Sequence, residues 1–315
     1  MLAVAALVAA PAGAQKAFPE PSPLPAPVEP PPEGVIDQLA ITEADLRMTV
    51  PVSIADGSPW PFVIDTGSER TVLSIELAQR LDLPRGPMRR VTTMAGTAPA
   101  PTARVPDLQV GSIAIGEIEA PVFTRANLGA IGMLGIDALQ GHKVAIDFDR
   151  DTMTLVPSRK RRRPPPRRDE IVVVARSLYG QLIVTDARWR NHKIAVVLDT
   201  GSPLTIGNAA LLRLGQRPPP NLGSVTMIAV TGAPIPADSY RLDRLEIGGV
   251  SFLGVPVVIA DVAPFHKFGL TDRPALLLGM NALRLFRSVD IDFANRTIVL
   301  KLPRDTQAGA RGFGR

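Results

Sequence analysis

Short apolar runs separated by turn residues dominate the pattern of hydrophobic and polar positions along the chain. Apolar and polar residues alternate at 48–54, as in a half-buried strand, whereas the continuous apolar runs at 60–64 and 194–198 are typical of buried strands. Further strands are predicted near residues 71–73, 105–110, 113–118, 121–124, 144–148, 153–156, 171–174 and 182–186. Only short helices interrupt them, at 75–81 and 209–214, and Ser74 is placed to cap the first. The pattern predicts a mostly β protein.

The second half of the chain repeats the first. Three landmarks recur in the same order: residues 62–68 (FVIDTGS) at 196–202 (VVLDTGS), residues 131–139 at 275–283, and residues 145–148 at 290–293. The offsets between equivalent residues are 134, 144 and 145 positions, which a duplicated domain with loop insertions explains.

Six segments are predicted along the chain. They are a signal peptide at 1–14, a Pro-rich tether at 15–44, a first domain at 45–157, a basic Pro/Arg linker at 158–170, a second domain at 171–302 and a flexible tail at 303–315. The apolar residues 2–10, followed by Ala12-Gly13-Ala14, fit a secretory signal and predict export to the periplasm or medium. The apolar run is shorter than the roughly 20 residues of a membrane span.

Composition excludes several kinds of site. The chain has no Cys, so a disulfide, a thiolate metal site and a Cys nucleophile are all excluded. The formal charge is +5, and residues 159–168 alone carry seven positive charges, so the rest of the chain carries −2. We interpret this tract as a solvated linker rather than a nucleic-acid patch or an import signal, and we expect no nucleic-acid partner.

The two Asp-Thr-Gly-Ser loops are the candidate chemistry. Each buried strand delivers one aspartate, Asp65 or Asp199, to its end, where a glycine permits a tight turn and hydroxyl groups flank it. One such triplet alone would be an ordinary turn. Because the loop occurs twice, we expect one site with two carboxylates, one from each half. The three histidines, His142, His192 and His266, are scattered singly, so neither a metal nor another cofactor is predicted.

These motifs resemble those of the retropepsin-like and pepsin-like aspartic proteases, with two tandem Asp-Thr-Gly domains in one chain. The resemblance rests on the two Asp-Thr-Gly-Ser loops and on the apolar-apolar-Gly segments that follow them, at 133–135 and 277–279. The resemblance implies an all-β fold in which two similar retropepsin-like barrel lobes form a bilobal pseudo-dimer with the cleft between them. It also implies that Asp65 and Asp199 are catalytic, supported by Thr66, Gly67, Ser68, Thr200, Gly201 and Ser202.

The resemblance assigns roles to these supporting residues. The threonines would lock the loops together, and the glycines would present backbone N–H groups to the carboxylates. The hydroxyls of Ser68 and Ser202 would donate to the outer carboxylate oxygens and lower the first apparent pKa of the pair. Residues 91–101 and 225–236 would form flaps.

The sequence therefore predicts an exported aspartic endopeptidase that hydrolyses polypeptides and acts as a monomer without a membrane span. An alternative is a catalytically silent, exported peptide-binding module that keeps the protease fold. A glycosidase would also use paired carboxylates, but that reading leaves the repeated loops unexplained.

Overall fold

The computed structural model describes the greater part of both predicted domains. The described residues are 47–55, 57–158, 169–178 and 180–303, together with three short strands at 8–11, 38–40 and 42–44. The rest of the predicted signal peptide and tether lies outside the described residues, as does nearly all of the predicted basic linker and tail.

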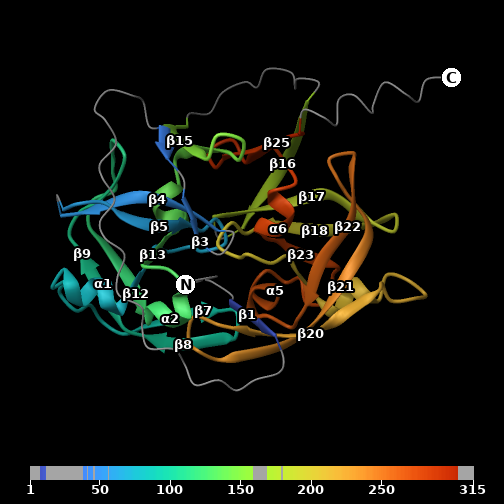
Figure 1. The fold of residues 1–315 in the computed structure, drawn as a ribbon, viewed down its shortest axis with the longest axis horizontal. Coiled ribbons are helices and arrows are strands. Elements are labelled where there is room, and N and C mark those ends of the chain that lie inside the picture. Colours follow the sequence, from blue (N-terminus) through green and yellow to red (C-terminus); the bar gives the residue numbers. More distant parts are fainter. Residues whose placement is uncertain are drawn as a thin grey trace.

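The first half of the chain consists of short strands and three short helices (Figure 1). Its elements, after β1 (Val8–Pro11) and β2 (Gln38–Ala40), are β3 (Thr42–Ala44), β4 (Arg47–Ile54), β5 (Trp60–Ile64), β6 (Val72–Ser74), α1 (Ile75–Arg80), β7 (Arg89–Thr93), β8 (Gly96–Ala100), β9 (Thr102–Val105), β10 (Leu108–Val110), β11 (Ile113–Ala114), β12 (Ile118–Phe123), α2 (Arg125–Leu128), β13 (Gly132–Leu134), α3 (Ile136–Leu139), β14 (His142–Asp147) and β15 (Thr152–Pro157). Nine strands form one barrel-like sheet in the order β11-β10-β4-β5-β13-β6-β12-β9, with β3 beside β4, and β7 and β8 form a separate hairpin.

The second half repeats this architecture, as predicted. Its elements are β16 (Glu170–Leu178), β17 (Gln181–Trp189), β18 (His192–Leu198), β19 (Ile206–Gly207), α4 (Ala209–Leu212), β20 (Asn221–Ile228), β21 (Pro234–Ile247), β22 (Val250–Ile259), α5 (Ala263–Lys267), β23 (Ala275–Leu278), α6 (Met280–Leu283), β24 (Ser288–Asp292) and β25 (Thr297–Lys301). They belong to a fourteen-stranded sheet in the order β1-β20-β21-β22-β19-β23-β18-β17-β16-β25-β24-β14-β15-β2. An additional pairing of β21 with β17 closes the second barrel.

Strands from the two halves meet in the larger sheet at the pair β14 and β24. These strands are equivalent in the repeat, and their antiparallel register places Val144 opposite Ile291 and Ile146 opposite Val289. β15 flanks β14, and β25 and β16 follow β24 on the other side. The two lobes are therefore joined by a continuous sheet as well as by contacts between their barrels.

The strands that deliver the two aspartates run through the core. Phe62 and Ile64 of β5 and Val196 and Leu198 of β18 are all buried in one hydrophobic cluster that extends through both lobes. Continuous burial explains why these strands read as uninterrupted apolar runs rather than as alternating ones. The core thus fixes the points at which both acidic loops begin.

The local prediction about helix capping is confirmed. Ser74 Oγ accepts a hydrogen bond from the Leu77 N–H at 3.1 Å, so it caps α1 as expected. The helices α1 and α4 end one and two residues earlier than predicted, a difference common at helix ends. Trp60 and Trp189 are both buried in the core.

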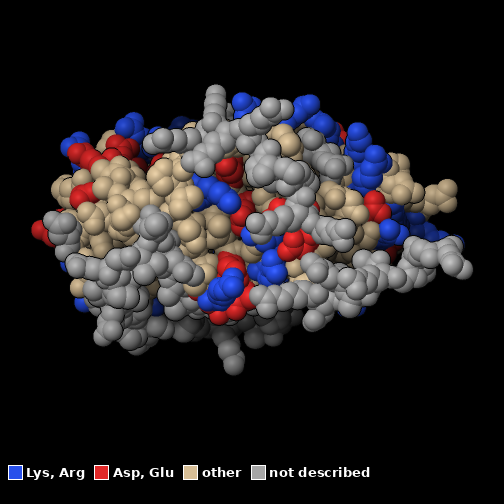
Figure 2. Space-filling model, turned by 90° about the horizontal axis from the view of Figure 1, so that it is seen from above, with Lys and Arg blue, Asp and Glu red and all other residues tan. Residues whose placement is uncertain are grey.

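Charged side chains of both signs are interspersed over the described surface on the face shown in Figure 2. Ion pairs between described residues link the halves of the chain. Lys143 Nζ lies 2.9 Å from Asp290 Oδ2 across the shared sheet, and Lys267 Nζ lies 2.6 Å from Glu69 Oε1. Within the described residues, no helix has the length and apolar character that crossing a bilayer requires.

Candidate active site

The two Asp-Thr-Gly-Ser loops begin directly after β5 and β18. The N–H of Asp65 donates to the Leu134 carbonyl at 2.9 Å, and the N–H of Asp199 donates to the Leu278 carbonyl at 3.0 Å. Leu134 and Leu278 end β13 and β23, which run parallel to β5 and β18. The apolar-apolar-Gly segments singled out in the sequence therefore hold the acidic loops in place.

The glycine that follows each supporting strand packs against the backbone of the acidic loop. A Cβ atom on Gly135 would lie 2.3 Å from the carbonyl carbon of Arg70, and one on Gly279 would lie 2.2 Å from the carbonyl oxygen of Leu204. Neither position has room for any side chain. The third residue of the apolar-apolar-Gly segment is thus required by close packing of backbone on backbone.

The two threonines bind the loops to one another across the lobe interface. The Thr66 N–H donates to Thr200 Oγ1 at 3.0 Å, and the Thr200 N–H donates to Thr66 Oγ1 at 3.3 Å. The hydroxyls in turn donate to the opposite strand, Thr66 to the Leu198 carbonyl at 3.1 Å and Thr200 to the Ile64 carbonyl at 2.7 Å. This is the lock that the resemblance implies, and it is fully buried.

Each aspartate carboxylate lies against the glycine of the opposite loop. A Cβ atom on Gly67 would lie 2.6 Å from Asp199 Oδ1, and one on Gly201 would lie 2.3 Å from Asp65 Cγ. Asp65 Oδ1 accepts a hydrogen bond from the Gly67 N–H at 2.9 Å. Both aspartates are 0% exposed. Two carboxyl groups are therefore enclosed together at the junction of the lobes.

Burial is the main influence on the acidity of this pair. It raises the pKa of Asp65 well above its ordinary value, and the charge of Asp199 raises that pKa further, whereas the Gly67 N–H and the Arg47 charge lower it. Burial also raises the pKa of Asp199 to about 7. The nearby Gly201 N–H lowers this pKa, although it does not form a hydrogen bond to the Asp199 carboxylate. The two carboxyl groups therefore do not both ionise at acidic or nearly neutral pH, and the pair keeps at least one proton over this range.

The predicted role of the two serine hydroxyls is wrong. Ser68 Oγ donates to the Arg70 carbonyl at 2.7 Å, and Ser202 Oγ donates to the Leu204 carbonyl at 2.7 Å. A hydroxyl has one proton, so neither group can also donate to a carboxylate. The serines instead close the acidic loops by bonding to the backbone carbonyl two residues ahead.

Replacing both serines by alanine should therefore leave the acidic limb of the pH profile where it is. The variant with Ser68→Ala and Ser202→Ala loses two hydrogen bonds within the loops, so we expect its thermal unfolding temperature to fall. The measurement is kcat/KM against pH for the wild type and the double variant. An acidic limb displaced to higher pH in the variant would show that the hydroxyls do reach the carboxylates.

Two buried polar residues of the site escaped prediction from the sequence. Arg47 begins β4 and is 0% exposed, and its guanidinium donates to the carbonyls of Leu128 at 3.2 Å and Gly129 at 2.7 Å. Gln181 begins β17, is equally buried, and donates from Nε2 to the Gly67 carbonyl. The two positions are separated by the same 134 residues as the aspartates, so the repeat offset was the signal that could have found them.

Arg47→Gln is expected to displace the acidic limb of the pH profile upward. The charge of Arg47 lowers the pKa of both aspartates, so its removal makes the shared proton harder to lose. Arg47→Lys is the matched control, because it keeps the charge and should hold the limb near its wild-type position. The measurement is kcat/KM against pH. If the acidic limb lies at the same pH in all three proteins, the guanidinium acts through packing alone.

A second pair of polar contacts supports the two acidic loops. Thr71 Oγ1 donates to Asp137 Oδ1 at 2.8 Å, and Thr205 Oγ1 donates to Asn281 Oδ1 at 2.7 Å. Both threonines also accept from the glycine of the supporting segment at 3.1 Å. These residues stand at equivalent positions of the repeat, so the support has the same form in both lobes.

Two hairpins reach across the lobe interface, at the positions expected for flaps. Met94, between β7 and β8, is 1% exposed, packs in the hydrophobic cluster of the second lobe with Phe265, and accepts a hydrogen bond from the Ala263 N–H at 3.0 Å. Val230, between β20 and β21, is 1% exposed and packs in a cluster of the first lobe with Val72. Each tip is thus held by the opposite lobe.

Comparison with known protein families agrees with this geometry. A family model described as aspartyl protease matches the chain twice, over residues 50–138 and 185–282, which together make up more than half of its length. Each matched region contains one Asp-Thr-Gly-Ser loop and the apolar-apolar-Gly segment that supports it. No curated protein matches the chain. The chain therefore belongs to the aspartyl protease family.

Proposed function

We propose that this protein is an aspartic endopeptidase in which Asp65 and Asp199 together activate a water molecule. The observation that carries the proposal is the enclosure of both carboxylates, each against the glycine of the opposite loop. At such proximity the two groups cannot both ionise readily, so one remains an acid while the other serves as a base. A single pair then supplies both partners of general acid-base catalysis at one pH.

Peptide hydrolysis needs no other reacting group of the protein. The ionised carboxylate accepts a proton from water as the water oxygen attacks the scissile carbonyl carbon, and the protonated carboxyl donates to the carbonyl oxygen. The carbon-nitrogen bond of the tetrahedral intermediate then breaks as the leaving nitrogen takes up the proton that the first carboxylate accepted from water, and a hydroxyl of the intermediate returns a proton to the second carboxylate. The threonine lock and the supporting strands hold the two carboxyl groups in register through these steps.

Access to the pair depends on the two hairpins. Both carboxylates are fully buried, and the tips at Met94 and Val230 are packed on the opposite lobes. A polypeptide reaches the carboxylates when the tips leave these positions and the hairpins separate. On this proposal the enzyme acts as one chain on a polypeptide substrate, after export directed by its apolar residues 2–10.

The decisive experiment is proteolysis of a diverse peptide library, analysed by mass spectrometry across pH, with and without a statine-type inhibitor. We expect cleavage at internal peptide bonds that the inhibitor suppresses. Peptides that bind and stay intact at every pH would instead identify a silent peptide-binding module.

A dilution series tests the single-chain unit. Because both acidic loops belong to one polypeptide, activity per mole of protein should not change on dilution. Activity that falls in second order, with dissociation visible by light scattering, would mean that two chains combine their loops.

A further inference from the structure

The support of the two acidic loops differs between the lobes in one functional group. Asp137 of α3 and Asn281 of α6 stand at equivalent positions of the repeat, and each side-chain Oδ1 accepts a hydrogen bond from a threonine hydroxyl. In the second lobe the amide also donates, from Nδ2 to the Pro256 carbonyl of β22 at 3.1 Å. In the first lobe a carboxyl stands in place of the amide, so the equivalent donor exists only when that carboxyl is protonated.

Hydrogen-bond donors reach only one oxygen of the Asp137 carboxyl. Its Oδ1 accepts from the Thr71 N–H at 2.8 Å, from Thr71 Oγ1 at 2.8 Å and from the Ala138 N–H at 2.9 Å. Its Oδ2 is buried and has no hydrogen-bond partner among the described residues. Because an oxygen that shares a negative charge is costly to bury without a donor, this arrangement suits a protonated carboxyl better than an ionised one.

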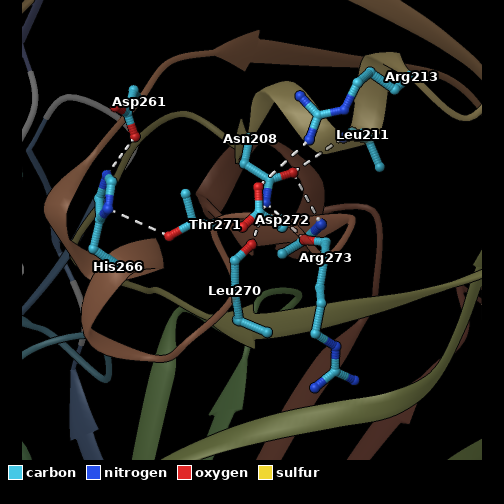
Figure 3. Close-up of polar contacts among 10 residues, drawn as sticks. Asn208, Leu211, Arg213, Asp261, His266, Leu270, Thr271, Asp272 and Arg273 are labelled. Atoms are coloured by element: carbon cyan, nitrogen blue, oxygen red, sulfur yellow. Dashed lines mark hydrogen bonds and ion pairs between the residues drawn. The ribbon is translucent and has the colours of Figure 1, made fainter.

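The amides of the second lobe show how a side chain of this shape is satisfied. Asn208 Nδ2 donates to the carbonyls of Leu270 at 2.6 Å and Arg273 at 2.7 Å, and its Oδ1 accepts from the Leu211 N–H at 3.1 Å (Figure 3). Each of these amides therefore uses one atom to accept and the other to donate. The Asp137 carboxyl can do both only while it holds a proton.

The surroundings of Asp137 act on its charge in opposite directions. Burial raises the pKa of Asp137 above its ordinary value of 3.8, whereas the hydrogen bonds from Thr71 and the positive charge of Arg70 lower it, and burial prevails. The other titratable side chains on the adjoining segments are Glu69, which is paired with Lys267, and His142 and Lys143 of β14, of which Lys143 is paired with Asp290.

A short chain of hydrogen bonds connects Asp137 with Asp65. The Thr71 hydroxyl, which donates to Asp137, accepts from the Gly135 N–H at 3.1 Å. The preceding carbonyl, that of Leu134, accepts from the Asp65 N–H at 2.9 Å. A change in the Asp137 carboxyl therefore reaches the backbone that carries Asp65.

We propose that Asp137 is a positioning residue, which holds the Asp65 loop firmly only while its carboxyl is protonated. The protonated carboxyl offers the same donor and acceptor as the Asn281 amide, so both lobes are then supported alike. Ionisation removes the donor and leaves a charge in a largely buried place, which weakens the support of Asp65 and not that of Asp199. The consequence for peptide hydrolysis rests on the proposed function, whereas the hold on the loop does not.

Hydrogen exchange tests the proposal in a protein with Asp65→Asn and Asp199→Asn, in which this pair no longer titrates. The backbone N–H groups of residues 65–71 and 135 are compared with and without the further change Asp137→Asn. The folded protein binds the Asp137 proton more tightly than the unfolded chain does, so the ionised carboxyl costs stability only above about pH 4. Asp137→Asn should therefore slow exchange about threefold or more at pH 8 and leave it unchanged at pH 3. An equal effect at both pH values would overturn the role of the proton.

Asn281→Asp is the matched variant in the other lobe. It places the same carboxyl beside the Asp199 loop, where Leu204 stands at the position equivalent to Arg70 and supplies no positive charge. Exchange at residues 199–205 should become about threefold faster or more at pH 8 and stay unchanged at pH 3, while residues 65–71 exchange as before. Faster exchange in both loops would overturn the local support.

Carbon-13 NMR of the Asp137 carboxyl follows the proton directly in the protein without any substitution. The signal should titrate with a midpoint above the ordinary value of 3.8. Arg70→Leu should move this midpoint to higher pH, and Arg70→Lys, which keeps the charge, should leave it near its original place. A carboxyl that titrates at or below its ordinary value would overturn the proposal, even if the variants at 137 and 281 fail to fold.

Discussion

Asp65→Asn and Asp199→Asn should each abolish peptide hydrolysis, with kcat/KM falling about 10³-fold or more. An amide cannot exchange a proton with water in the role of either carboxyl, and the remaining carboxyl cannot be acid and base together. The double variant should be about as inactive as either single one, because the pair works as a unit. A single variant that keeps near-wild-type activity would show that the two carboxylates do not form one site.

The same variants should be more stable than the wild type at neutral pH and above. The pKa of Asp199 is raised to about 7 in the folded protein from an ordinary value of 3.8, so the folded state binds this proton more tightly than the unfolded state does. The group therefore reduces stability as pH rises above about 4, by on the order of a few kcal/mol once pH exceeds 7. Asn carries no charge and avoids this loss.

Thermal unfolding at pH 4 and pH 8 measures the effect. The gain in unfolding temperature for Asp199→Asn should be large at pH 8 and small at pH 4. Asp272→Asn is the control, because that side chain is 95% exposed and should change neither activity nor unfolding temperature. A variant that is inactive and also destabilised at pH 8 would indicate lost structure rather than a lost catalytic group.

The sequence was sufficient to predict the two lobes and the acidic loops, because both rest on short patterns that occur twice. A buried strand that ends in Asp-Thr-Gly-Ser is recognisable by itself, and its recurrence 134 residues later predicts that the two copies serve one site. The segments at 133–135 and 277–279 also occur twice, which made them recognisable, although the sequence did not reveal their supporting role. Pairing of β5 with β13 and of β18 with β23 then gives those segments their physical reason.

Other parts of the site depend on contacts that no local pattern encodes. In the sequence, Arg47 resembles an exposed polar residue at the start of a strand. In the structure it is fully buried, and two backbone carbonyls of a distant turn accept hydrogen bonds from its guanidinium. The direction of the Ser68 hydroxyl depends on the local turn of the backbone, which brings the Arg70 carbonyl within hydrogen-bonding distance. The docking of Met94 in the second lobe is likewise a tertiary contact between segments far apart in the chain.

Gly201→Ala is expected to destroy the site by displacing a carboxylate. The added Cβ atom would lie 2.3 Å from Asp65 Cγ and 2.5 Å from its Oδ1, distances that no real pair of such atoms adopts. The loop backbone is tied by Thr200 to the first lobe, so it cannot retreat without breaking the threonine lock. We expect kcat/KM to fall about 10²-fold or more and the unfolding temperature to drop.

A double-mutant cycle shows whether that clash is the cause. Gly201→Ala combined with Asp65→Ala removes the carboxylate that the new methyl group meets, so the double variant should unfold at a higher temperature than Gly201→Ala alone. Both proteins are inactive for independent reasons, and stability is therefore the informative measurement. If Asp65→Ala adds its own effect without relieving that of Gly201→Ala, the glycine is needed for backbone conformation and not for the close approach of the two loops.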